Sequence, residues 1–427
     1  MQRPFKKMPR STEILIMVCT SAFVDSLGYG IIIPFLPQYA MSLGASDLDV
    51  GIIFATYALV QLVTTIPFGL LSDRYGRRPF MISGMLLLGI ASLLFPLAQT
   101  VHLMIVCRAI QGLAASATWS SAVALVADTF PGNDKGTKLG ITAGVTNMGG
   151  IAGPLLGGAL SDVNFNIPFL LIASLSIFMF AYMFFRLKLP PRENKVDETS
   201  YIKMIRGALR IRNVVIIILI NALTMIFWGF VEPLMPPYLS GRFSLSSTQI
   251  GIIFGAMSLI YASIQPLVGR LTDKYGQKRF IIAGMALQAS IGLIIPLCSD
   301  VVSLTVCLVL IAAVGAIAWT PLTPLYVESL QDGNMEAYAT VGSLFGTAYY
   351  VGYIIGPVIG TLVSSHFGFG AVFIFNSIIL LALVLLSKLY IKDGKRAESE
   401  TPQAMEFKIS RPRSISHKKP QDLTISE

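Results

Sequence analysis

A polar segment of twelve residues occurs twice in the chain, as GLLSDRYGRRPF at 69–80 and as GRLTDKYGQKRF at 269–280. Each copy follows one long apolar run and precedes another. A short polar segment between apolar runs of about 20 residues is typical of a turn at the aqueous face of a membrane. The two copies therefore predict a chain that crosses the bilayer repeatedly and consists of two similar halves.

The composition argues against a soluble fold. The chain of 427 residues is 54% hydrophobic and 13% charged, with a mean hydropathy of +0.69. A large soluble core would still have polar faces, whereas runs such as 214–220 and 373–386 have almost none. The runs are continuous and do not alternate, which argues against a transmembrane β-barrel. The net charge of +9 comes from basic residues gathered in one set of loops, so it does not indicate nucleic-acid binding.

The apolar runs predict an all-α membrane protein of twelve transmembrane helices in two pseudo-symmetric six-helix bundles. We expect helices at 12–39, 48–71, 79–98, 101–128, 136–161, 166–189, 212–239, 247–271, 279–298, 301–329, 336–365 and 367–391. The predicted domains are an N-terminal tail at 1–11, a first bundle at 12–189, a linker at 190–211, a second bundle at 212–391 and a disordered tail at 392–427. The linker has the composition of a short amphipathic helix on the membrane surface.

Lys and Arg residues indicate the orientation in the membrane. They gather in the N-terminal tail, the linker and the turns after the second, fourth and eighth helices, and the alternate turns have almost none except Arg242. We therefore expect both termini and the two repeated turns in the cytoplasm. The chain has no Asn-x-Ser/Thr sequon, which favours a prokaryotic plasma membrane over a membrane that faces a glycosylating lumen.

Further matches extend the internal repeat. Residues 51–54 and 251–254 both read GIIF, and Gly153-Pro154 has a counterpart in Gly356-Pro357. Two similar halves with the same orientation predict a pseudo-twofold axis along the membrane normal and a substrate path between the halves. In this pattern the chain resembles the major facilitator superfamily over nearly its whole length.

The resemblance implies that the repeated turn is a cytoplasmic latch, closed in the outward-open state of such transporters and broken in the inward-open state. The second copy has Gln277 where the first has Arg77, which predicts a weaker second latch. For a single copy, the plain alternative is a basic turn that obeys the positive-inside bias.

Other residues of the turn have predicted roles as well. Gly69 is expected to permit close helix approach, and Asp73 to cap a helix or meet the positive end of a neighbouring one. Asp128 and Glu328 lie at equivalent helix ends, where acids are usually solvated or latch partners, and for these two we favour a latch role over transport chemistry. The candidate gating residues are Gly69, Asp73, Arg74, Gly76, Arg77, Arg78, Asp128, Gly269, Asp273, Gly276 and Glu328.

A strip of glycines marks the predicted fifth helix, in GITAGVTNMGGIAGPLLGG at 140–158. Such a strip lets two helices touch backbone to backbone, and the proline is expected to bend the helix. Ordinary small-residue packing is the alternative. The form GxxxGPxxGG resembles the signature of the drug:proton antiporters, which implies export more than import. The candidate helix-packing residues are Gly140, Gly144, Gly149, Gly153, Pro154, Gly157, Gly158, Gly356 and Pro357.

Three ionisable residues within predicted spans are candidates for proton coupling. Asp25 lies midway along the first span, where burial favours a protonated carboxyl and a nearby arginine favours a carboxylate. A carboxylate that binds either a proton or a cationic substrate would couple the two directly. Arg108 of the fourth span should face the bundle interior, because a midspan arginine costs about 2.5–3.5 kcal/mol on insertion scales. Its RxxxG spacing resembles the family's fourth-helix motif, which implies a role in proton transfer. Glu232 of the seventh span would be an auxiliary acid.

Each of the three also has a plainer alternative. Asp25 could be a structural acid paired permanently with Arg108, and Arg108 could be a snorkelling residue near its helix start. Glu232 could lie near the outer mouth as a solvated acid.

Polar and aromatic residues of the spans are candidates to line the substrate path, although most aromatic residues in membrane helices are packing or interface anchors. The candidates are Tyr29, Gln61, Trp119, Asn147, Asn221, Trp228, Gln265, Trp319, Tyr349 and Tyr353. The first span and the runs FVEPLMP and GYIIGP are also similar to vesicular amine transporters. Those transporters have acids in the tenth and eleventh spans, where this chain has Trp319-Thr320 and Gly346-Thr347.

Together these features predict a secondary transporter and not an enzyme: a monomeric proton-coupled antiporter in the lipid bilayer that exports small amphipathic or cationic organic compounds. Protons would be the coupling ion, and no other cofactor is expected. No metal is expected either, because the four cysteines lack metal-ligand spacing. The absence of a GxxxxGK[ST] motif argues against an ATP-driven pump. The alternatives are uptake of a metabolite by symport, and a lipid-linked glycan flippase or a non-transporting receptor.

Overall fold

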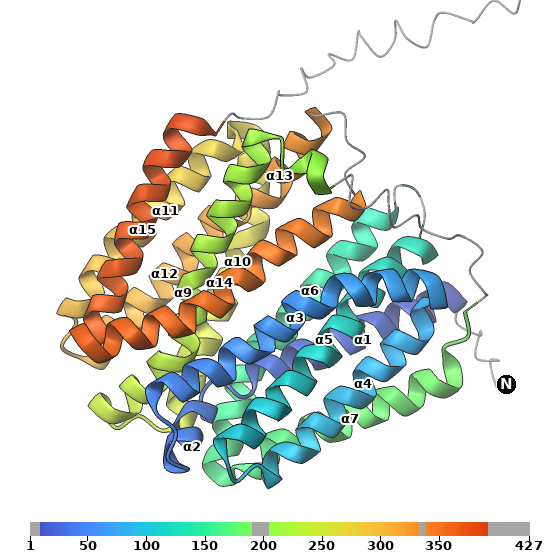
Figure 1. Cartoon of the computed structure of the whole chain (residues 1–427), viewed down its shortest axis with the longest axis horizontal. Helices are drawn as coiled ribbons and strands as arrows, with labels where there is room; N and C mark the ends of the chain where they lie inside the picture. Colours follow the sequence, from blue (N-terminus) through green and yellow to red (C-terminus); the bar gives the residue numbers. More distant parts are fainter. Residues whose placement is uncertain (1–8, 131, 133, 190–204, 333–337, 392–427) are drawn as a thin grey trace, which may run out of the picture.

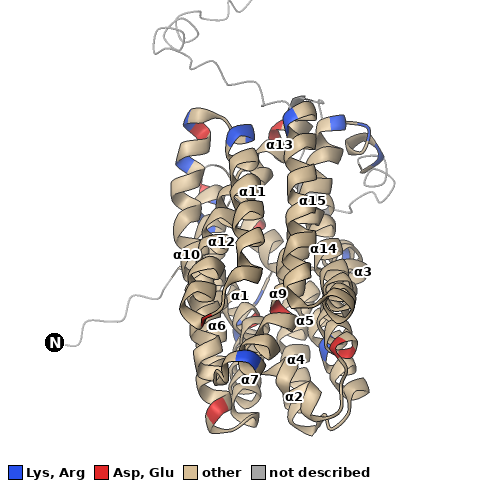
Figure 2. Ribbon diagram, turned by 90° about the vertical axis from the view of Figure 1, so that its left-hand side faces the viewer, with Lys and Arg blue, Asp and Glu red and all other residues tan. Residues whose placement is uncertain are grey.

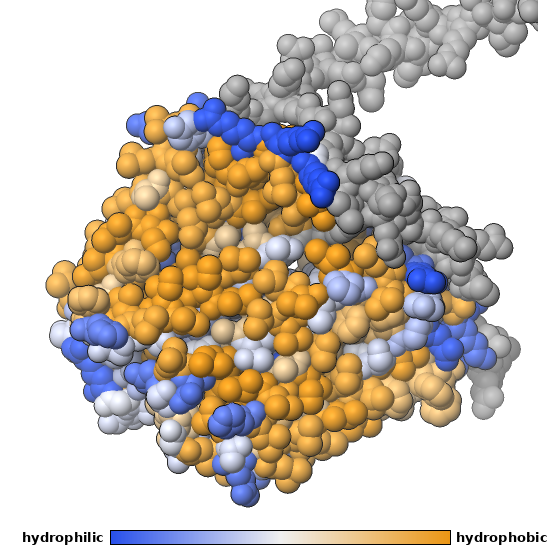
Figure 3. Space-filling view, viewed as in Figure 1, coloured by the Kyte–Doolittle hydropathy of each residue, from blue (hydrophilic) through white to orange (hydrophobic). Residues whose placement is uncertain are grey.

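The structure, a computed structural model, describes residues 9–130, 132, 134–189, 205–332 and 338–391. Residues 1–8 of the predicted N-terminal tail, the linker residues 190–204 and the predicted tail at 392–427 lie outside the described residues. Twelve helices in the described part are long and apolar enough to cross a membrane, as predicted. Lys, Arg, Asp and Glu residues gather toward the helix ends, and the ribbon between them is largely uncharged (Figure 2). The face seen in Figure 3 carries a broad apolar band of the kind that lipid covers.

The helices form two sets that correspond to the two sequence halves (Figure 1). The first set consists of α1 (Arg10–Gly30), α2 (Leu36–Ser42), α3 (Asp47–Tyr75), α4 (Arg77–Leu94), α5 (Val101–Thr129), α6 (Asp134–Val163) and α7 (Asn166–Arg186). The second set consists of α9 (Arg212–Phe243), α10 (Ser247–Tyr275), α11 (Gln277–Ile294), α12 (Val301–Trp319), α13 (Leu322–Asp332), α14 (Tyr338–Phe367) and α15 (Phe369–Tyr390). Short 3-10 turns, η1 (Phe95–Leu97) and η2 (Ile295–Leu297), extend α4 and α11.

Two helices that we predicted to be continuous are broken. The predicted helix at 12–39 is divided into α1 and α2 by turns over 31–35, and the one at 301–329 is divided into α12 and α13 around residues 320–321. Each break contains a proline, Pro34 or Pro321, which has no backbone N–H to give to the helix.

The repeated twelve-residue segments form the predicted tight turns. Gly76 alone separates α3 from α4, and Gly276 alone separates α10 from α11. Their φ angles are 92° and 89°, a region that favours glycine over any residue with a Cβ. We call the end of the molecule that carries these two turns the hinge end. Arg78, at the start of α4, donates to the carbonyl oxygen of Phe184 near the end of α7 at 2.8 Å, so the end of α7 lies there too.

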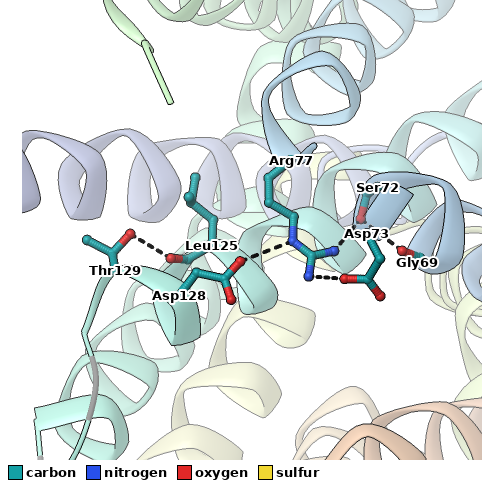
Figure 4. A network of polar contacts seen from close by, with 7 residues as sticks. All are labelled: Gly69, Ser72, Asp73, Arg77, Leu125, Asp128 and Thr129. Atoms are coloured by element: carbon teal, nitrogen blue, oxygen red, sulfur yellow. Dashed lines mark hydrogen bonds and ion pairs between the residues drawn. The ribbon is translucent and has the colours of Figure 1, made fainter. Parts of the chain in front are cut away.

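A buried arginine organises the first turn (Figure 4). Arg77 donates to the Ser72 hydroxyl at 2.6 Å, forms a close ion pair with Asp73 and reaches Asp128 on α5 at 3.4 Å. In the second copy, the Gln277 amide donates to Glu328 on α13 at 2.8 Å. Both helix-end acids therefore contact the turn, one through the guanidinium of Arg77 and the other through the amide of Gln277. Each contact joins helices within one half.

One expectation about these turns is wrong in this structure. Gly69 and Gly269 do not permit a close approach, because a Cβ at either position would meet nothing within 4 Å. Asp73 pairs with Arg77, the first residue of the neighbouring helix α4, which fits the second of its two expected roles. Among the other candidate gating residues, the Arg74 guanidinium lies 5.4 Å from the ring centroid of Tyr75.

The glycine strip packs α6 against α1 over only part of its length. A Cβ on Gly149 would lie 2.5 Å from the carbonyl oxygen of Phe23, and one on Gly157 would collide with the carbonyl oxygen of Ile31. The second half repeats this packing between α14 and α9, where a Cβ on Gly356 would lie 2.6 Å from the carbonyl oxygen of Ile226. The prediction that Gly140 and Gly144 pack against another helix is wrong in this structure, because both face open space.

The two halves meet at the end opposite the hinge turns. There, a Cβ on Gly51 of α3 would lie 3.2 Å from the carbonyl oxygen of Pro357 on α14. On the other helix pair, Gly158 of α6 and Gly251 of α10 come so close that a Cβ on either would collide with the opposing backbone. Glycines on the hinge-end parts of these four helices have nothing within 4 Å, namely Gly69, Gly140, Gly144, Gly269 and Gly346. As far as the described residues go, the two halves are therefore in contact at one end and apart at the hinge end.

The glycine strip makes a prediction about stability. Replacing Gly157 with Ala should destabilise the protein by about 1–3 kcal/mol, because the added methyl group meets the backbone of α1. Replacing Gly140 with Ala on the same helix should stabilise it by up to about 1 kcal/mol, because the site is open and alanine favours the helix. Thermal unfolding of the two purified variants in detergent checks the signs; equal shifts would contradict the packing described here.

Candidate functional site

Two adjoining cavities lie between the halves. The first has a volume of about 420 Å³ and the second about 270 Å³. Five residues line both cavities and mark the place where they adjoin: Ser26, Tyr29, Trp319, Tyr349 and Tyr353. Because the walls come from helices of both halves, any relative movement of the halves changes the shape of the cavities.

Asp25 lies on the wall of the first cavity and is half-buried. Its helix α1 is held by α6 through the glycine contacts at Gly149 and Gly153, which leaves the face with Asp25 and Tyr29 toward the cavity. No hydrogen bond or ion pair joins Asp25 to any of the described residues. The carboxyl group is therefore in reach of a bound cation or proton and is not occupied by a protein partner.

Arg108 is fully buried and does not line either cavity. Its guanidinium donates to the carbonyl oxygen of Ile53 at 3.3 Å and to Gln111 at 3.1 Å. The ring centroids of Tyr57 and Tyr29 lie 4.4 Å and 5.5 Å from its central carbon. The snorkelling alternative is wrong because the side chain has no exposed surface, and the ion pair with Asp25 is absent.

Glu232 on α9 connects the halves at the second cavity. Its carboxylate accepts a close hydrogen bond from the Tyr29 hydroxyl of the other half and one from Tyr353 at 3.3 Å. The residue is only 4% exposed, so the alternative of a solvated acid at the outer mouth is wrong. A hydrogen bond across the halves that depends on a carboxylate can respond to protonation of that group.

Nine of the ten predicted lining residues do line the cavities. Gln61 and Trp119 line the first, whereas Asn147, Trp228 and Gln265 line the second. Asn147 and Gln265, on α6 and α10, are 3.4 Å apart and join the halves midway along the helices.

The prediction that Asn221 lines the substrate path is wrong. This residue is fully buried and lines neither cavity. Its side chain donates to the carbonyl oxygen of Phe345 at 2.8 Å and accepts the indole N–H of Trp319 at 3.0 Å. Asn221 therefore orients a cavity residue and does not itself face the cavity.

Several lining residues were missed from the sequence. Tyr57, Phe345 and Tyr350 line the first cavity, and Phe254 and Tyr261 line the second. The repeat carried a signal for one of them, because Tyr261 occupies the position that matches Gln61 in the other half. Tyr57 precedes Gln61 by one helical turn, so helical spacing would have identified it as well.

A family profile described as Major Facilitator Superfamily matches residues 18–231 and 217–423. The chain is 27% identical over 367 residues to "MFS-type transporter SLC18B1" of Rattus norvegicus, which covers 80% of this chain and 79% of the relative. It is 26% identical over 360 residues to "Multidrug resistance protein 2" of Bacillus subtilis, which covers 80% of this chain and 89% of the relative.

Solved structures show the same fold. A bacterial homolog of the human lysosomal transporter Spinster, in an inward-facing and occupied conformation, superposes with a TM-score of 0.77 at 13% identity. The alignment covers 90% of this chain and 98% of that one. The family profile, the twelve spans and the shared fold agree, so the chain belongs to the Major Facilitator Superfamily and is a secondary transporter of small molecules, not an enzyme.

Proposed function

We propose that the protein exports small amphipathic or cationic organic compounds in exchange for protons, by alternating access between its two halves. The observation that carries this proposal is the position of Asp25, an acid without a protein partner on the wall of the larger cavity. A proton and a cationic substrate would compete for this one carboxylate, and competition of that kind is sufficient for exchange.

The walls of the larger cavity support an aromatic or cationic substrate. Eight of its sixteen lining residues are aromatic, and Asp25 is its only acidic lining residue in the described part of the chain. Aromatic faces attract cations and also bury apolar groups, so one cavity can accept amphipathic molecules of differing shape. The relative named "Multidrug resistance protein 2" adds support for a substrate of this class.

The arrangement of the halves supports alternating access. The glycine contacts close one end of the molecule, and the glycines at the hinge end face open space. The hinge end carries the basic turns around Arg77 and Arg279, so the positive-inside bias places it, with both termini, in the cytoplasm. In this proposed orientation the open end faces the cytoplasm, which is the side from which an exporter in the plasma membrane would receive its substrate.

The position of Asp25 makes a prediction about binding and pH. Binding of the lipophilic cation tetraphenylphosphonium to the purified protein should strengthen as the pH rises, because the carboxylate form accumulates. In Asp25→Asn, binding should be at least about tenfold weaker, because opposite charges about 6 Å apart at an effective dielectric constant of about 20 attract each other by roughly 2–3 kcal/mol. Binding to this variant should also lose the pH dependence. Isothermal titration calorimetry at several pH values measures both effects.

A matched control is Asp300→Asn. Asp300 caps α12 by accepting the N–H of Ser303 at 2.9 Å, and asparagine caps a helix equally well. This variant should bind the cation as the natural protein does. Proton-driven efflux at the natural rate from Asp25→Asn would rule out the proposed coupling residue.

The direction of transport can be tested separately. Everted membrane vesicles with an acidic lumen should accumulate the cation, whereas intact cells should lose it, because an exporter moves its substrate toward the side from which protons enter. Dissipating the proton gradient should abolish both movements. Accumulation by intact cells and loss from everted vesicles would instead identify an uptake system.

A further inference from the structure

Asp162, in the last turn of α6, joins this helix to α10 of the other half. Its two carboxylate oxygens accept the backbone N–H groups of Ser247 at 3.1 Å and Thr248 at 2.9 Å. The Thr248 hydroxyl also donates to the carbonyl oxygen of Gly158, one turn earlier on α6, at 3.4 Å. A Cβ on Gly158 would collide with the carbonyl oxygen of Ser247, so this glycine brings the two helices within hydrogen-bonding reach.

These contacts complete the N-terminus of α10. The first N–H groups of a helix have no partner within the helix and carry the positive end of its dipole. Ser246 accepts the N–H of Gln249 within its own helix, and the N–H groups of Ser247 and Thr248 are bound by Asp162. The contact therefore combines two charge-assisted hydrogen bonds with a favourable interaction between a carboxylate and a helix dipole.

The pseudo-equivalent helix pair, α3 with α14, closes the same end differently. When Gly153-Pro154 is aligned with Gly356-Pro357, the residue that matches Asp162 is Ser365. Its hydroxyl donates to the carbonyl oxygen of Leu362 in its own helix at 3.0 Å. The contact made by Asp162 is thus a property of one helix pair and is not required by the fold.

The geometry of α6 and α10 links the contact made by Asp162 to the conformation of the transporter, that is, to which end of the molecule is closed. Asn147 and Gln265 join the helices midway, and beyond them Gly140 and Gly144 face open space at the hinge end. If the halves rock about the central cavities so that the hinge end closes, the opposite ends of α6 and α10 must separate. The bonds from Asp162 would then have to break.

We infer that Asp162 is a latch that holds the two halves together at the end opposite the hinge turns and releases the N-terminus of α10 whenever that end opens. The residue is a positioning residue, because it lines neither cavity. It stabilises the inward-facing state relative to the outward-facing one, independently of what the cavities bind. The inference therefore survives if Asp25 proves not to be the coupling residue.

Hydrogen–deuterium exchange of the full-length protein in detergent tests this inference without a label. In Asp162→Ala, amide exchange over 247–254 should become about tenfold faster, because charge-assisted bonds are lost and the end opens more often. Exchange over 134–145, at the hinge end of α6, should slow at the same time, because that end closes more often. The opposite signs at the two ends of one helix pair distinguish a shift between states from simple loosening.

Asp300→Ala is the matched control. It removes a helix-capping acid of α12 whose bonds to Ser303 stay within one half. This variant should speed exchange near residue 303 and leave 247–254 and 134–145 unchanged. If Asp162→Ala speeds exchange only at 247–249 and leaves the hinge end unchanged, Asp162 is a local helix cap and the inference is wrong.

A second variant changes the other side of the contact, so that the inference can still be tested if Asp162→Ala does not fold. Ser247→Pro deletes one donated N–H, and proline is favourable at the first position of a helix. It should produce the same pattern of exchange with a smaller amplitude. Combining it with Asp162→Ala should add little beyond the single Asp162→Ala change, because both remove the same contact. Fully additive shifts would overturn the inference.

Discussion

Backbone contact at small residues is the constraint on which the rest of this structure depends. Lipid is as apolar as most side chains, so helices in a membrane gain little from hydrophobic burial and associate through close packing and hydrogen bonds. Gly149, Gly153 and Gly157 bring α6 onto the backbone of α1, and Gly356 brings α14 onto α9. These two contacts set the rotation of α1 and α9, and therefore decide which of their side chains face the cavities.

The polar residues of the interior follow from that rotation. Asp25 and Tyr29 on α1 and Glu232 on α9 reach the central space, and the bond between Tyr29 and Glu232 joins the two halves there. Arg108 lies deeper, among the rings of Tyr57 and Tyr29. A buried charge needs partners, and here backbone carbonyl, amide and aromatic groups take the place that an acid was expected to fill.

The contacts between the halves are graded along the molecule. They are tightest at Gly158 and Gly251, consist of single hydrogen bonds at the level of Asn147 and Gln265, and are absent at the hinge-end glycines of the described helices. Such a gradient fits two rigid halves that rock about a central point. The printed contacts of Arg77 join residues of α3, α4 and α5, and they can therefore keep these three helices together while that half moves.

The sequence alone determined the class of protein, the number of spans, the repeated turns and most of the cavity lining, because these depend on apolar run length, local turn chemistry and internal repetition. It could not determine that Asn221 lies behind Trp319, that Arg108 donates to a backbone carbonyl and not to Asp25, or that Asp162 reaches α10. Those facts depend on helix rotation and on which end of the halves is closed. Rotation and closure arise from contacts between residues far apart in the chain, which only the tertiary structure brings together.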